Sequence, residues 1–344
     1  MTGKEETDEI LHVGIDLGTS RSAISASDGQ KFVVDSYVGW PVDMVASKVL
    51  KKKILIGEAA IKNRVMLDLH RPLERGLIKE GSDKDLQAVR EIISHLLGRV
   101  GRKSGQQVRA VVGVPAEAMR VNKQQLRNVL AGLVDSLMIV SEPFAVAYGL
   151  DALLHALIID VGAGTADFCV MKGRFPTEED QRTLTQAGDW VDEQLEKLVS
   201  AGHPDVNFSG YMAREWKEKY AFVGDPKKPV KVTVPVKGKP TEIDITGALR
   251  TACESLIAPV TETMLELLAK VEPEYQAEVR NHIILSGGSA LIRGLGETLE
   301  LALDEYGGGS VRRVEDPVFV GAEGGLKIAL DARASDWEKV PAKA

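Results

Sequence analysis

One pattern occurs twice in the chain, and this repeat restricts the fold more than any other feature. The first copy is Ile15-Asp16-Leu17-Gly18-Thr19-Ser20, and the second is IDVGAGTAD, which runs from Ile159 to Asp167. In both copies an apolar run ends at an aspartate, glycine and threonine follow, and a second apolar run begins. A carboxylate at the end of a buried strand is costly unless a positive group lies beside it. The pattern therefore predicts two β-hairpins, each with an aspartate at its turn.

The segments after the two hairpins also follow the same order. Each copy predicts a unit of strand, aspartate–glycine turn, strand, strand, helix, strand and helix. In the first half we expect a helix over 83–100, strands over 108–115 and 137–140, and a helix that starts near Glu142. In the second half we expect a third strand within 183–188, helices over 189–202 and 257–271 with a bend at Pro259, and a strand within 281–288. The repeat predicts two α/β domains of like topology that face one another across a cleft, each with an insertion.

Composition narrows the class of protein. The 344 residues are 44% hydrophobic and 27% charged, which is typical of a soluble globular protein. The net charge of −7 argues against nucleic acid as the main partner. Cys169 and Cys253 lie in apolar stretches, which is typical of reduced core cysteines in the cytoplasm, and the histidines lack the spacing of a zinc site. No apolar stretch is long enough to span a bilayer, and the acidic residues 1–10 predict neither a signal peptide nor a membrane anchor.

The composition of the two hairpins indicates phosphate binding. Turns rich in glycine, serine and threonine offer accessible backbone N–H groups and hydroxyls to phosphate oxygens. We expect the two turns to hold a triphosphate from two sides, with Asp16 and Asp160 on the hydration shell of Mg²⁺. Either turn alone is more typical of a plain hairpin with a solvated aspartate, but the repeat favours the nucleotide site. There is no Walker A sequence, and Gly162-Ala163-Gly164 does not continue into the dinucleotide-binding pattern.

A third glycine-rich point follows the strand expected within 281–288. Here Ser286-Gly287-Gly288-Ser289 leads towards a helix. Backbone without side chains at this position would let a flat base or a ribose approach closely. A simple turn between a strand and a helix explains the same residues.

Five segments together resemble the actin superfamily, which also includes Hsp70 chaperones and sugar kinases. In order, they are similar to its phosphate-1, connect-1, phosphate-2, adenosine and connect-2 motifs: D16LGTS, VSEPFAVAYG (140–149), D160VGAGTAD, LSGGSALIRG (285–294) and VGAEGG (320–325). The order and spacing hold from about residue 11 to 330. Residues 56–80 and 217–224 resemble actins most closely. Among bacterial actins the chain is most similar to the magnetosome filament proteins; MreB-like actins resemble it less, because they usually carry an N-terminal membrane helix.

The resemblance implies an actin-like ATPase fold: two duplicated ribonuclease H-like α/β domains that face a nucleotide cleft, each with an inserted smaller subdomain. It also implies a division of the chain into four subdomains and two tails. These are an acidic N-terminal tail (1–10), subdomain IA (11–35 and 76–150, with 318–330 packing back), subdomain IB (36–75), subdomain IIA (151–205 and 246–317), subdomain IIB (206–245) and a C-terminal tail (331–344).

Site residues follow from the same resemblance. Glu142 corresponds to the residue that orients the attacking water in prokaryotic actins, and Asp160 shares the catalytic role. Lys217 and Glu218 correspond to residues that contact ribose and base. The full set expected to bind nucleotide is Asp16, Gly18, Thr19, Ser20, Asp160, Gly162, Ala163, Gly164, Thr165, Gly188, Asp192, Lys217, Glu218, Gly287, Gly288 and Ser289, with Mg²⁺ held through water by Asp16 and Asp160.

One position departs from the actin pattern. The phosphate-1 loop of actin carries a lysine shortly after the turn, whereas this chain continues Ser20-Arg21-Ser22. Bacterial relatives often lack the lysine too, so more of the phosphate charge would rest on Mg²⁺. Arg21 could compensate for the lysine, but we expect it to be a strand residue that faces solvent.

The function implied is that of a cytoplasmic, cytoskeletal ATP hydrolase that depends on ATP, ADP and Mg²⁺. Its partners would be other copies of itself in a filament and magnetosome-associated proteins, with no nucleic acid and no membrane insertion, and its role would be to position magnetosomes in a chain. The alternatives are an Hsp70-like chaperone or a small-molecule kinase of the same superfamily. A chaperone needs a substrate-binding domain, and only a short segment follows residue 330; for a kinase, no catalytic base for a small molecule is evident.

Overall fold

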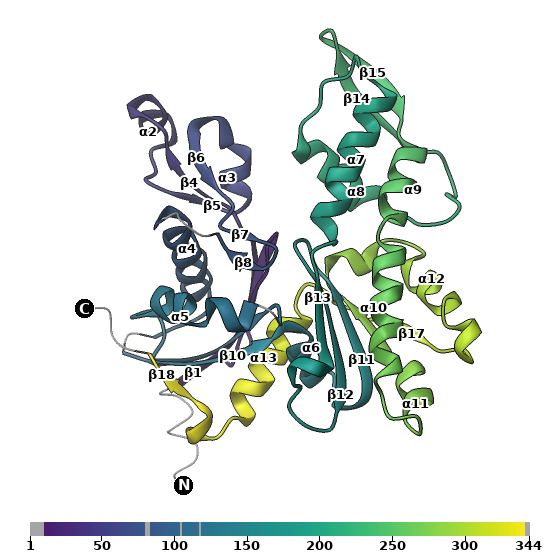
Figure 1. Ribbon diagram of the computed structural model, residues 1–344. Helices are drawn as coiled ribbons and strands as arrows, with labels where there is room; N and C mark the ends of the chain where they lie inside the picture. Colours follow the sequence, from purple (N-terminus) through teal and green to yellow (C-terminus); the bar gives the residue numbers. More distant parts are fainter. Residues whose placement is uncertain (1–9, 80–82, 104, 117, 341–344) are drawn as a thin grey trace. The chain divides into compact units, whose positions relative to one another are not determined.

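The structure is a computed structural model that describes residues 10–79, 83–103, 105–116 and 118–340, without the side chains of 118–122. The chain divides into two compact units (Figure 1): unit 1 is Met1–Leu153 with Asp316–Ala344, and unit 2 is Leu154–Glu315. The finer division into four subdomains stays a prediction. Nearly all of the N-terminal tail and the last four residues of the C-terminal tail lie outside the described residues.

Unit 1 is built on a six-stranded sheet with the order β18-β10-β9-β1-β2-β3. The strands are β1 (Ile10–Leu17), β2 (Arg21–Ala26), β3 (Lys31–Asp35), β9 (Gln107–Val114), β10 (Ser136–Ser141) and β18 (Glu338–Lys339). Strand β2 is antiparallel to both of its neighbours, β1 and β3, and β9 and β10 continue the sheet parallel to β1. The carboxyl ends of β1, β9 and β10 therefore meet at one edge of the sheet.

Unit 2 repeats this topology in a five-stranded sheet with the order β13-β12-β11-β16-β17. Its strands are β11 (Leu154–Val161), β12 (Ala166–Lys172), β13 (Gln181–Leu184), β16 (Ile283–Ser286) and β17 (Val311–Arg313). The first three strands are antiparallel, and β16 and β17 run parallel to β11. Asp16 on β1 and Asp160 on β11 occupy equivalent positions, so the duplicated α/β fold expected from the sequence is confirmed.

Helices of unit 1 cover both faces of its sheet. They include α4 (Asp83–Arg99), α5 (Ala118–Leu130), α6 (Glu142–Gly149) and α13 (Val320–Asp331). Alternate residues of β1 point to opposite faces. Val13 and Ile15 belong to a hydrophobic core shared with Ile92 of α4, whereas Gly14 contacts the backbone of α13. The aspartate at the end of β1 therefore shares the face that α13 covers.

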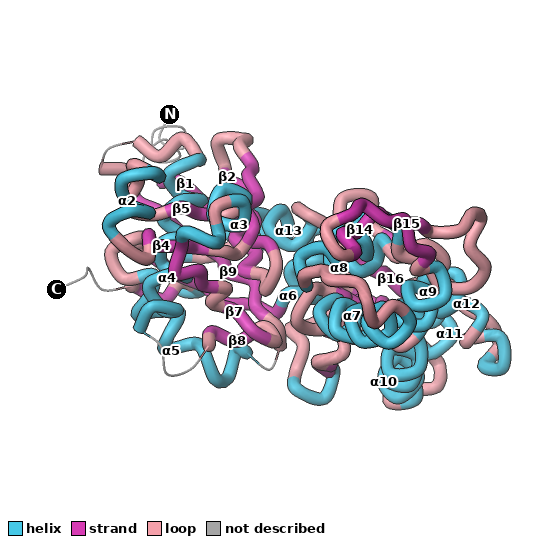
Figure 2. The backbone as a smooth tube through the Cα atoms, turned by 90° about the horizontal axis from the view of Figure 1, so that it is seen from above, coloured by secondary structure: helices cyan, strands magenta, loops and turns pink. Residues whose placement is uncertain are grey.

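The helices of unit 2 are α7 (Gly188–Gly202), α8 (Gly210–Tyr220), α9 (Thr246–Glu254), α10 (Ile257–Ala269), α11 (Gln276–Arg280) and α12 (Leu295–Leu301). Helix α7 contacts both α8 and α9, and the hairpin of β14 (Lys231–Val236) and β15 (Lys239–Asp244) lies beside them (Figure 1, Figure 2). Phe168 of β12, Leu195 of α7 and Leu285 of β16 are fully buried in one core, which fixes α7 against the sheet.

Unit 1 also carries a group of small elements between β3 and α4. They are β4 (Val38–Pro41), α2 (Met44–Leu50), β5 (Leu55–Ile56), α3 (Glu58–Lys62), β6 (Leu67–His70), β7 (Leu73–Glu74) and β8 (Leu77–Ile78). Strands β5, β4 and β6 form a three-stranded antiparallel sheet. Asp43 begins α2, because its carboxylate accepts hydrogen bonds from the backbone of Val45 and Ala46.

Three details differ from the sequence expectations. The third strand of unit 2 covers 181–184 instead of 183–188, and Gly188 begins α7. Pro259 does not bend a long helix: α10 begins at Ile257, which places the proline in the first turn, where its missing N–H costs no hydrogen bond. Within the expected C-terminal tail, Glu338 and Lys339 pair with β10 as strand β18.

Among the described helices, none is both long enough and apolar enough to cross a bilayer.

Helices α6 and α13 cross with their backbones in contact, which leads to a prediction about stability. A Cβ atom at Gly324 would lie 1.8 Å from the carbonyl oxygen of Ala145, and one at Gly149 would lie 2.9 Å from the Cα of Gly324. Gly324→Ala should therefore lower the free energy of unfolding by about 2 kcal/mol, as overpacking does. Gly98→Ala in α4 is the control, since a Cβ there meets nothing within 4 Å and should stabilise the helix by about 0.5–1 kcal/mol. Urea unfolding of both variants measures the difference, and equal effects would contradict the close crossing.

Candidate nucleotide-binding site

Asp16 lies at the carboxyl end of β1, half-buried, next to the first turn of a helix. It pairs with Ala23 of β2 and with Gly113 of β9 in the sheet. A Cβ atom at Gly321, the second residue of α13, would lie 2.9 Å from Asp16 Oδ2. The N-terminus of a helix stabilises a nearby negative charge. The sequence therefore needs glycine at this position of α13 so that the carboxylate can approach the helix.

Glu142 lies at the same edge of the unit 1 sheet as Asp16. It is the first residue of α6 and directly follows β10, and its side chain is half-buried. The nearest side-chain contact of a Cβ at Gly113 would be the Cγ of Glu142, at 3.5 Å. Gly113 thus stands between the two carboxylate residues without a side chain of its own. This arrangement places an acidic residue on either side of Gly113 at the edge of the sheet.

The turn of the first hairpin is tied back into unit 1 by its carbonyl groups. The hydroxyl of Ser36 donates to the carbonyl oxygen of Gly18 at 2.7 Å, and Nε of Arg71 donates to that of Thr19 at 3.1 Å. The backbone N–H of Gly76 donates to Thr19 Oγ1 at 3.2 Å, and Thr19 is only 5% exposed. The turn is therefore held in one conformation, with the side chain of Thr19 directed into the protein.

The residues after this turn differ in exposure. Ser20 is half-buried, and its carbonyl oxygen accepts a hydrogen bond from the N–H of Ser36 at 2.8 Å. Arg21 is exposed at the start of β2, where its guanidinium forms an ion pair with Asp35 at 3.5 Å. This is the strand position facing solvent that the sequence predicts for Arg21.

Asp160 occupies the equivalent position at the end of β11 in unit 2. It pairs with Asp167 of β12 and with Ser286 of β16, and it is half-buried. Desolvation by the surrounding protein raises the pKa of the Asp160 carboxyl to about 6, although the hydroxyl of Ser286 acts in the opposite direction. No lysine, arginine or histidine in the described part of the chain forms an ion pair with Asp160. The carboxylate thus lies where a cation from outside the protein would be favourable.

Gly287 follows β16 in a conformation that only glycine adopts easily. Its φ is +82°, and a Cβ there would lie 2.5 Å from Asp160 Oδ1 and 2.4 Å from the carbonyl oxygen of Val161. A Cβ at Gly288, by contrast, would meet nothing within 4 Å. The first glycine is therefore required by Asp160 and its strand, whereas the second faces open space that suits a ligand.

The turn of the second hairpin is attached to the beginning of α7. The N–H of Gly188 and the hydroxyl of Ser289 both donate to the carbonyl oxygen of Gly162, each at 3.0 Å. The N–H of Asp189 donates to the carbonyl oxygen of Ala163 at 2.7 Å. These bonds direct the carbonyl groups of Gly162 and Ala163 towards the start of α7. Gly164 and Thr165 complete the turn and are buried.

The hydroxyl of Ser289 thus has a positioning role, which gives a second prediction. Ser289→Ala removes one of the two hydrogen bonds to the Gly162 carbonyl, so we expect the free energy of unfolding to fall by about 1 kcal/mol and the affinity for ATP to fall several-fold. Thr263→Val is the control, since it removes the hydroxyl that donates to the Pro259 carbonyl oxygen within α10. Isothermal titration with ATP distinguishes the two. A loss of affinity in the control as large as in Ser289→Ala would refute the positioning role.

Lys217 binds the first turns of α7 through its ammonium group. Its ammonium donates to the carbonyl oxygen of Gly188 at 2.7 Å and lies 2.8 Å from Asp192 Oδ1. Burial raises the pKa of Asp192, and the positive charge of Lys217 opposes that shift. Lys217 is only 8% exposed, whereas Glu218, the next residue on α8, is exposed. The lysine and Asp192 therefore join α8 to α7 at the point where α7 meets the hairpin turn.

Arg214 is a residue of this cluster that the sequence reasoning missed. Its guanidinium lies 3.2 Å from Asp189 Oδ1 and 3.8 Å from Asp192 Oδ2. The spacing of three residues from Lys217 places both side chains on one face of α8, and this is the signal that was available. It gives the N-terminal turn of α7 two basic neighbours.

The donor groups fit a hydrated magnesium ion better than a metal bound directly by several side chains. Among the described residues there is no group of three or more histidine, cysteine, aspartate or glutamate side chains that could hold a metal ion. Mg²⁺ keeps several waters and takes few protein carboxylates. Asp160 offers such a carboxylate, and Asp16 offers a second one in unit 1.

Comparison with known proteins agrees with the topology. The family model for the MreB/Mbl protein matches residues 10–336. The actin-like protein MamK of Paramagnetospirillum magneticum is 37% identical over 338 residues, which are 98% of this chain and 97% of the relative. A structure of the MamK double helical filament superposes with a TM-score of 0.92 at 38% identity and covers 94% of this chain and 100% of that one. A non-polymerising MamK mutant bound to AMPPNP matches with a TM-score of 0.71 at 38% identity, over 94% of this chain and 99% of that one.

These matches cover both units and both hairpins. The MreB/Mbl model includes Asp16, Glu142, Asp160 and Gly287. The MreB/Mbl family model thus matches the chain, although the sequence suggested a weaker resemblance to MreB-like actins. The duplicated sheets, the paired aspartate turns and the identity over almost the whole length lead to one conclusion: the chain belongs to the actin-like MreB/Mbl family, and MamK is among its relatives in that family.

Proposed function

We propose that this protein is a magnesium-dependent ATP hydrolase that assembles with copies of itself into cytoskeletal filaments. The observation that carries the proposal is the duplicated aspartate turn, with Asp160 half-buried without a basic partner in the described chain and its turn fixed to α7. The relative bound to AMPPNP, an ATP analogue, supports nucleotide binding, and the MamK filament structure supports self-assembly. Cytoplasmic filaments alongside the magnetosome chain, with magnetosome-associated partners, are the location and role that we propose.

Catalysis mainly requires that the negative charge of the phosphates is neutralised and that the attacking water is positioned. Phosphoryl transfer to water depends chiefly on positioning and on neutralising the charge of the phosphates. When bound, Mg²⁺ would supply that neutralisation. Asp16 and Asp160 would hold it through its water ligands, and the backbone of the turns at 18–20 and 162–165 would contact phosphate oxygens. Glu142, half-buried at the start of α6, accepts a hydrogen bond from the attacking water and aligns it.

The remaining residues of the expected set have distinct proposed roles. Gly288 leaves space for the base or the ribose, because a Cβ there meets nothing within 4 Å. Glu218, exposed on α8, contacts the ribose or the base. Lys217, Gly188, Asp192 and Ser289 hold the turn and the start of α7 in place through the hydrogen bonds described above.

The alternatives in the superfamily are less well supported. A chaperone, DnaK of Mycoplasmoides gallisepticum, is 24% identical, and the matched region is 60% of its length. The MamK relatives match at 37% over nearly their whole length. A small-molecule kinase has no specific observation in its favour.

Sedimentation with nucleotide tests the proposal. The purified protein should pellet with ATP and Mg²⁺, release phosphate, and remain in the supernatant without nucleotide. Electron microscopy of the pellet should show filaments. A protein that stays monomeric under all conditions and transfers phosphate from ATP to a sugar would be a kinase, and the proposal would be wrong.

A further inference from the structure

The β7–β8 hairpin of unit 1 is attached to the turn of the first aspartate hairpin. Its two strands pair on either side of a two-residue turn, Arg75-Gly76, and the strand residues Leu73 and Ile78 are each only 2% exposed. The N–H of Gly76 donates to Thr19 Oγ1 at 3.2 Å. The buried strand residues and this hydrogen bond fix the place of Arg75 beside the first aspartate turn.

The Arg75-Gly76 turn also contacts the end of the neighbouring strand β9. A Cβ atom at Gly76 would lie 2.2 Å from Cγ of Pro115, the residue that directly follows β9. In the sheet, β9 lies between β1 and β10, and Glu142 directly follows β10. The turn therefore lies at the edge of the sheet that carries Asp16 and Glu142, at the ends of β1 and β9.

Arg75 differs from two other arginines near this turn in what surrounds its charge. Arg71 is half-buried, and its Nε donates to the carbonyl oxygen of Thr19 at 3.1 Å. Arg21 pairs with Asp35 at 3.5 Å. Arg75 is exposed, and no carboxylate among the described residues forms an ion pair with it. Its guanidinium can therefore bind an anion at this edge without first breaking an ion pair.

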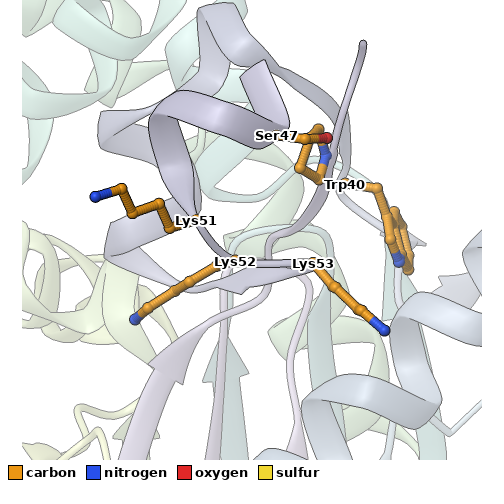
Figure 3. A pocket seen from close by; sticks show the side chains of 6 residues that line it. Trp40, Ser47, Lys51, Lys52 and Lys53 are labelled. Atoms are coloured by element: carbon orange, nitrogen blue, oxygen red, sulfur yellow. The ribbon is translucent and has the colours of Figure 1, made fainter. Parts of the chain in front are cut away.

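The backbone conformation of Arg75 does not by itself indicate a function. Its φ of 49° is in the left-handed region, but Lys51 has a φ of 53° and Lys237 has one of 49°. Lys237-Gly238 is the two-residue turn of the β14–β15 hairpin, and Lys51 follows α2 and lines the pocket of about 390 Å³ that Figure 3 shows. Neither lysine follows a strand of the two larger sheets. The position of Arg75 at the aspartate edge, and not its conformation, distinguishes it.

We propose that the guanidinium of Arg75 binds the terminal phosphate of ATP, a role that rests on the nucleotide site proposed above. A planar guanidinium donates two parallel hydrogen bonds to phosphate oxygens. The terminal phosphate is the one that water attacks, and Glu142, which aligns that water in the proposed site, follows the strand next to β9. Arg75 thus adds positive charge where ATP has a phosphate and ADP has none, and it makes the site prefer ATP.

Arg75→Asn tests this contact without removing the turn. Asparagine followed by glycine is the favoured sequence for a two-residue turn in which both φ angles are positive. The melting temperature without nucleotide should therefore stay the same or rise. The dissociation constant for AMPPNP with Mg²⁺ should rise about tenfold, because one charge-assisted contact is lost, whereas that for ADP should change less than about twofold. Equilibrium titrations at protein concentrations too low for pelleting measure both constants.

Arg75→Lys separates the charge of the side chain from its shape. Lysine keeps the positive charge but lacks the planar pair of donors. Its affinity for AMPPNP should lie between those of the wild type and Arg75→Asn. An affinity below that of Arg75→Asn would contradict a role for the positive charge.

Two matched variants control for the loss of one positive charge. Lys237→Asn makes the same exchange in unit 2, at the same position of a two-residue turn with glycine. Lys51→Asn removes a charge from another left-handed position of unit 1. Both variants change the net charge as Arg75→Asn does, and both should bind AMPPNP and ADP like the wild type. Equal losses of AMPPNP affinity in Arg75→Asn and Lys237→Asn would overturn the proposal.

The ratio of the two dissociation constants separates this proposal from the proposed function. A wild type that binds neither nucleotide would contradict the nucleotide site and, with it, the role of Arg75. Wild-type binding with equal losses of AMPPNP and ADP affinity in Arg75→Asn would overturn the role of Arg75 alone. The same conclusion would follow if Arg75→Asn bound both nucleotides like the wild type but no longer pelleted with ATP and Mg²⁺, because Arg75 would then belong to contacts between copies.

Discussion

Glu142→Ala is expected to lower the rate of ATP hydrolysis by about 100-fold or more while ATP binds with nearly unchanged affinity. The carboxylate lies at the start of α6, across Gly113 from Asp16, where it can align a water molecule. It is not expected to contribute to phosphate binding, because its negative charge would repel the phosphates. Phosphate release and isothermal titration measure the two quantities separately.

Two control variants separate this role from an effect on the helix. An acidic residue in the first turn also stabilises a helix through its dipole. Glu58→Ala in α3 removes such a residue away from the aspartate turns and should leave hydrolysis unchanged. Glu142→Gln keeps the shape of the side chain and should be nearly as inactive as Glu142→Ala. Hydrolysis at the wild-type rate in either Glu142 variant would refute the assignment.

Asp160→Asn is expected to stabilise the protein without nucleotide and to weaken the binding of ATP with Mg²⁺ by about 100-fold. In the folded state the surrounding protein raises the pKa of Asp160 from 3.8 to about 6. Above pH 6 the folded protein therefore holds a charge that is less favourable than in the unfolded chain. By linkage this costs up to about 3 kcal/mol, which the amide avoids. The same charge is what the hydrated cation requires, so stability and binding change in opposite directions.

The pH dependence of the unfolding free energy tests the sign of the stability change expected for Asp160→Asn. As the pH falls from 8 through 6 towards 4, the Asp160 carboxyl takes up its proton first in the folded state, so its unfavourable contribution disappears. The stability advantage of Asp160→Asn should be largest at pH 8 and small at pH 4, as measured by thermal unfolding without nucleotide. Asp244→Asn is the control of opposite sign, because hydrogen bonds from Thr246 lower the pKa of Asp244. An advantage for Asp160→Asn that is independent of pH would contradict the raised pKa.

The repeat in the sequence was sufficient to predict the duplicated sheets. Each aspartate turn lies between two strands that pair locally, so the periodicity of nearby residues carries the information. The parallel pairing of β1 with β9 joins residues 97 positions apart, and no local signal in the sequence indicates it. The helix over 83–100 and the start of α6 at Glu142 agree with the structure for the same local reasons.

Tertiary partners of individual side chains could not be predicted in this way. The resemblance to actins predicts that Lys217 contacts the nucleotide, but it does not show that Gly188 and Asp192 bind the ammonium group in the folded chain. Nor does it show that Gly76 donates to the hydroxyl of Thr19. Strand β18 escaped prediction because two residues carry no periodicity, and only their pairing with β10 defines them. Contacts between segments distant in sequence depend on packing, which no short pattern encodes.

Gly188 connects the second hairpin turn, the start of α7 and helix α8 through its own backbone N–H and carbonyl groups. Its N–H binds the turn of the second hairpin at Gly162, and its carbonyl oxygen binds Lys217 of α8. A shift of that turn by a few tenths of an ångström is therefore transmitted through the close-packed start of α7 to the outer helix α8. If the hairpin holds a nucleotide as proposed, loss of the terminal phosphate would be transmitted through the backbone of Gly188 to α8.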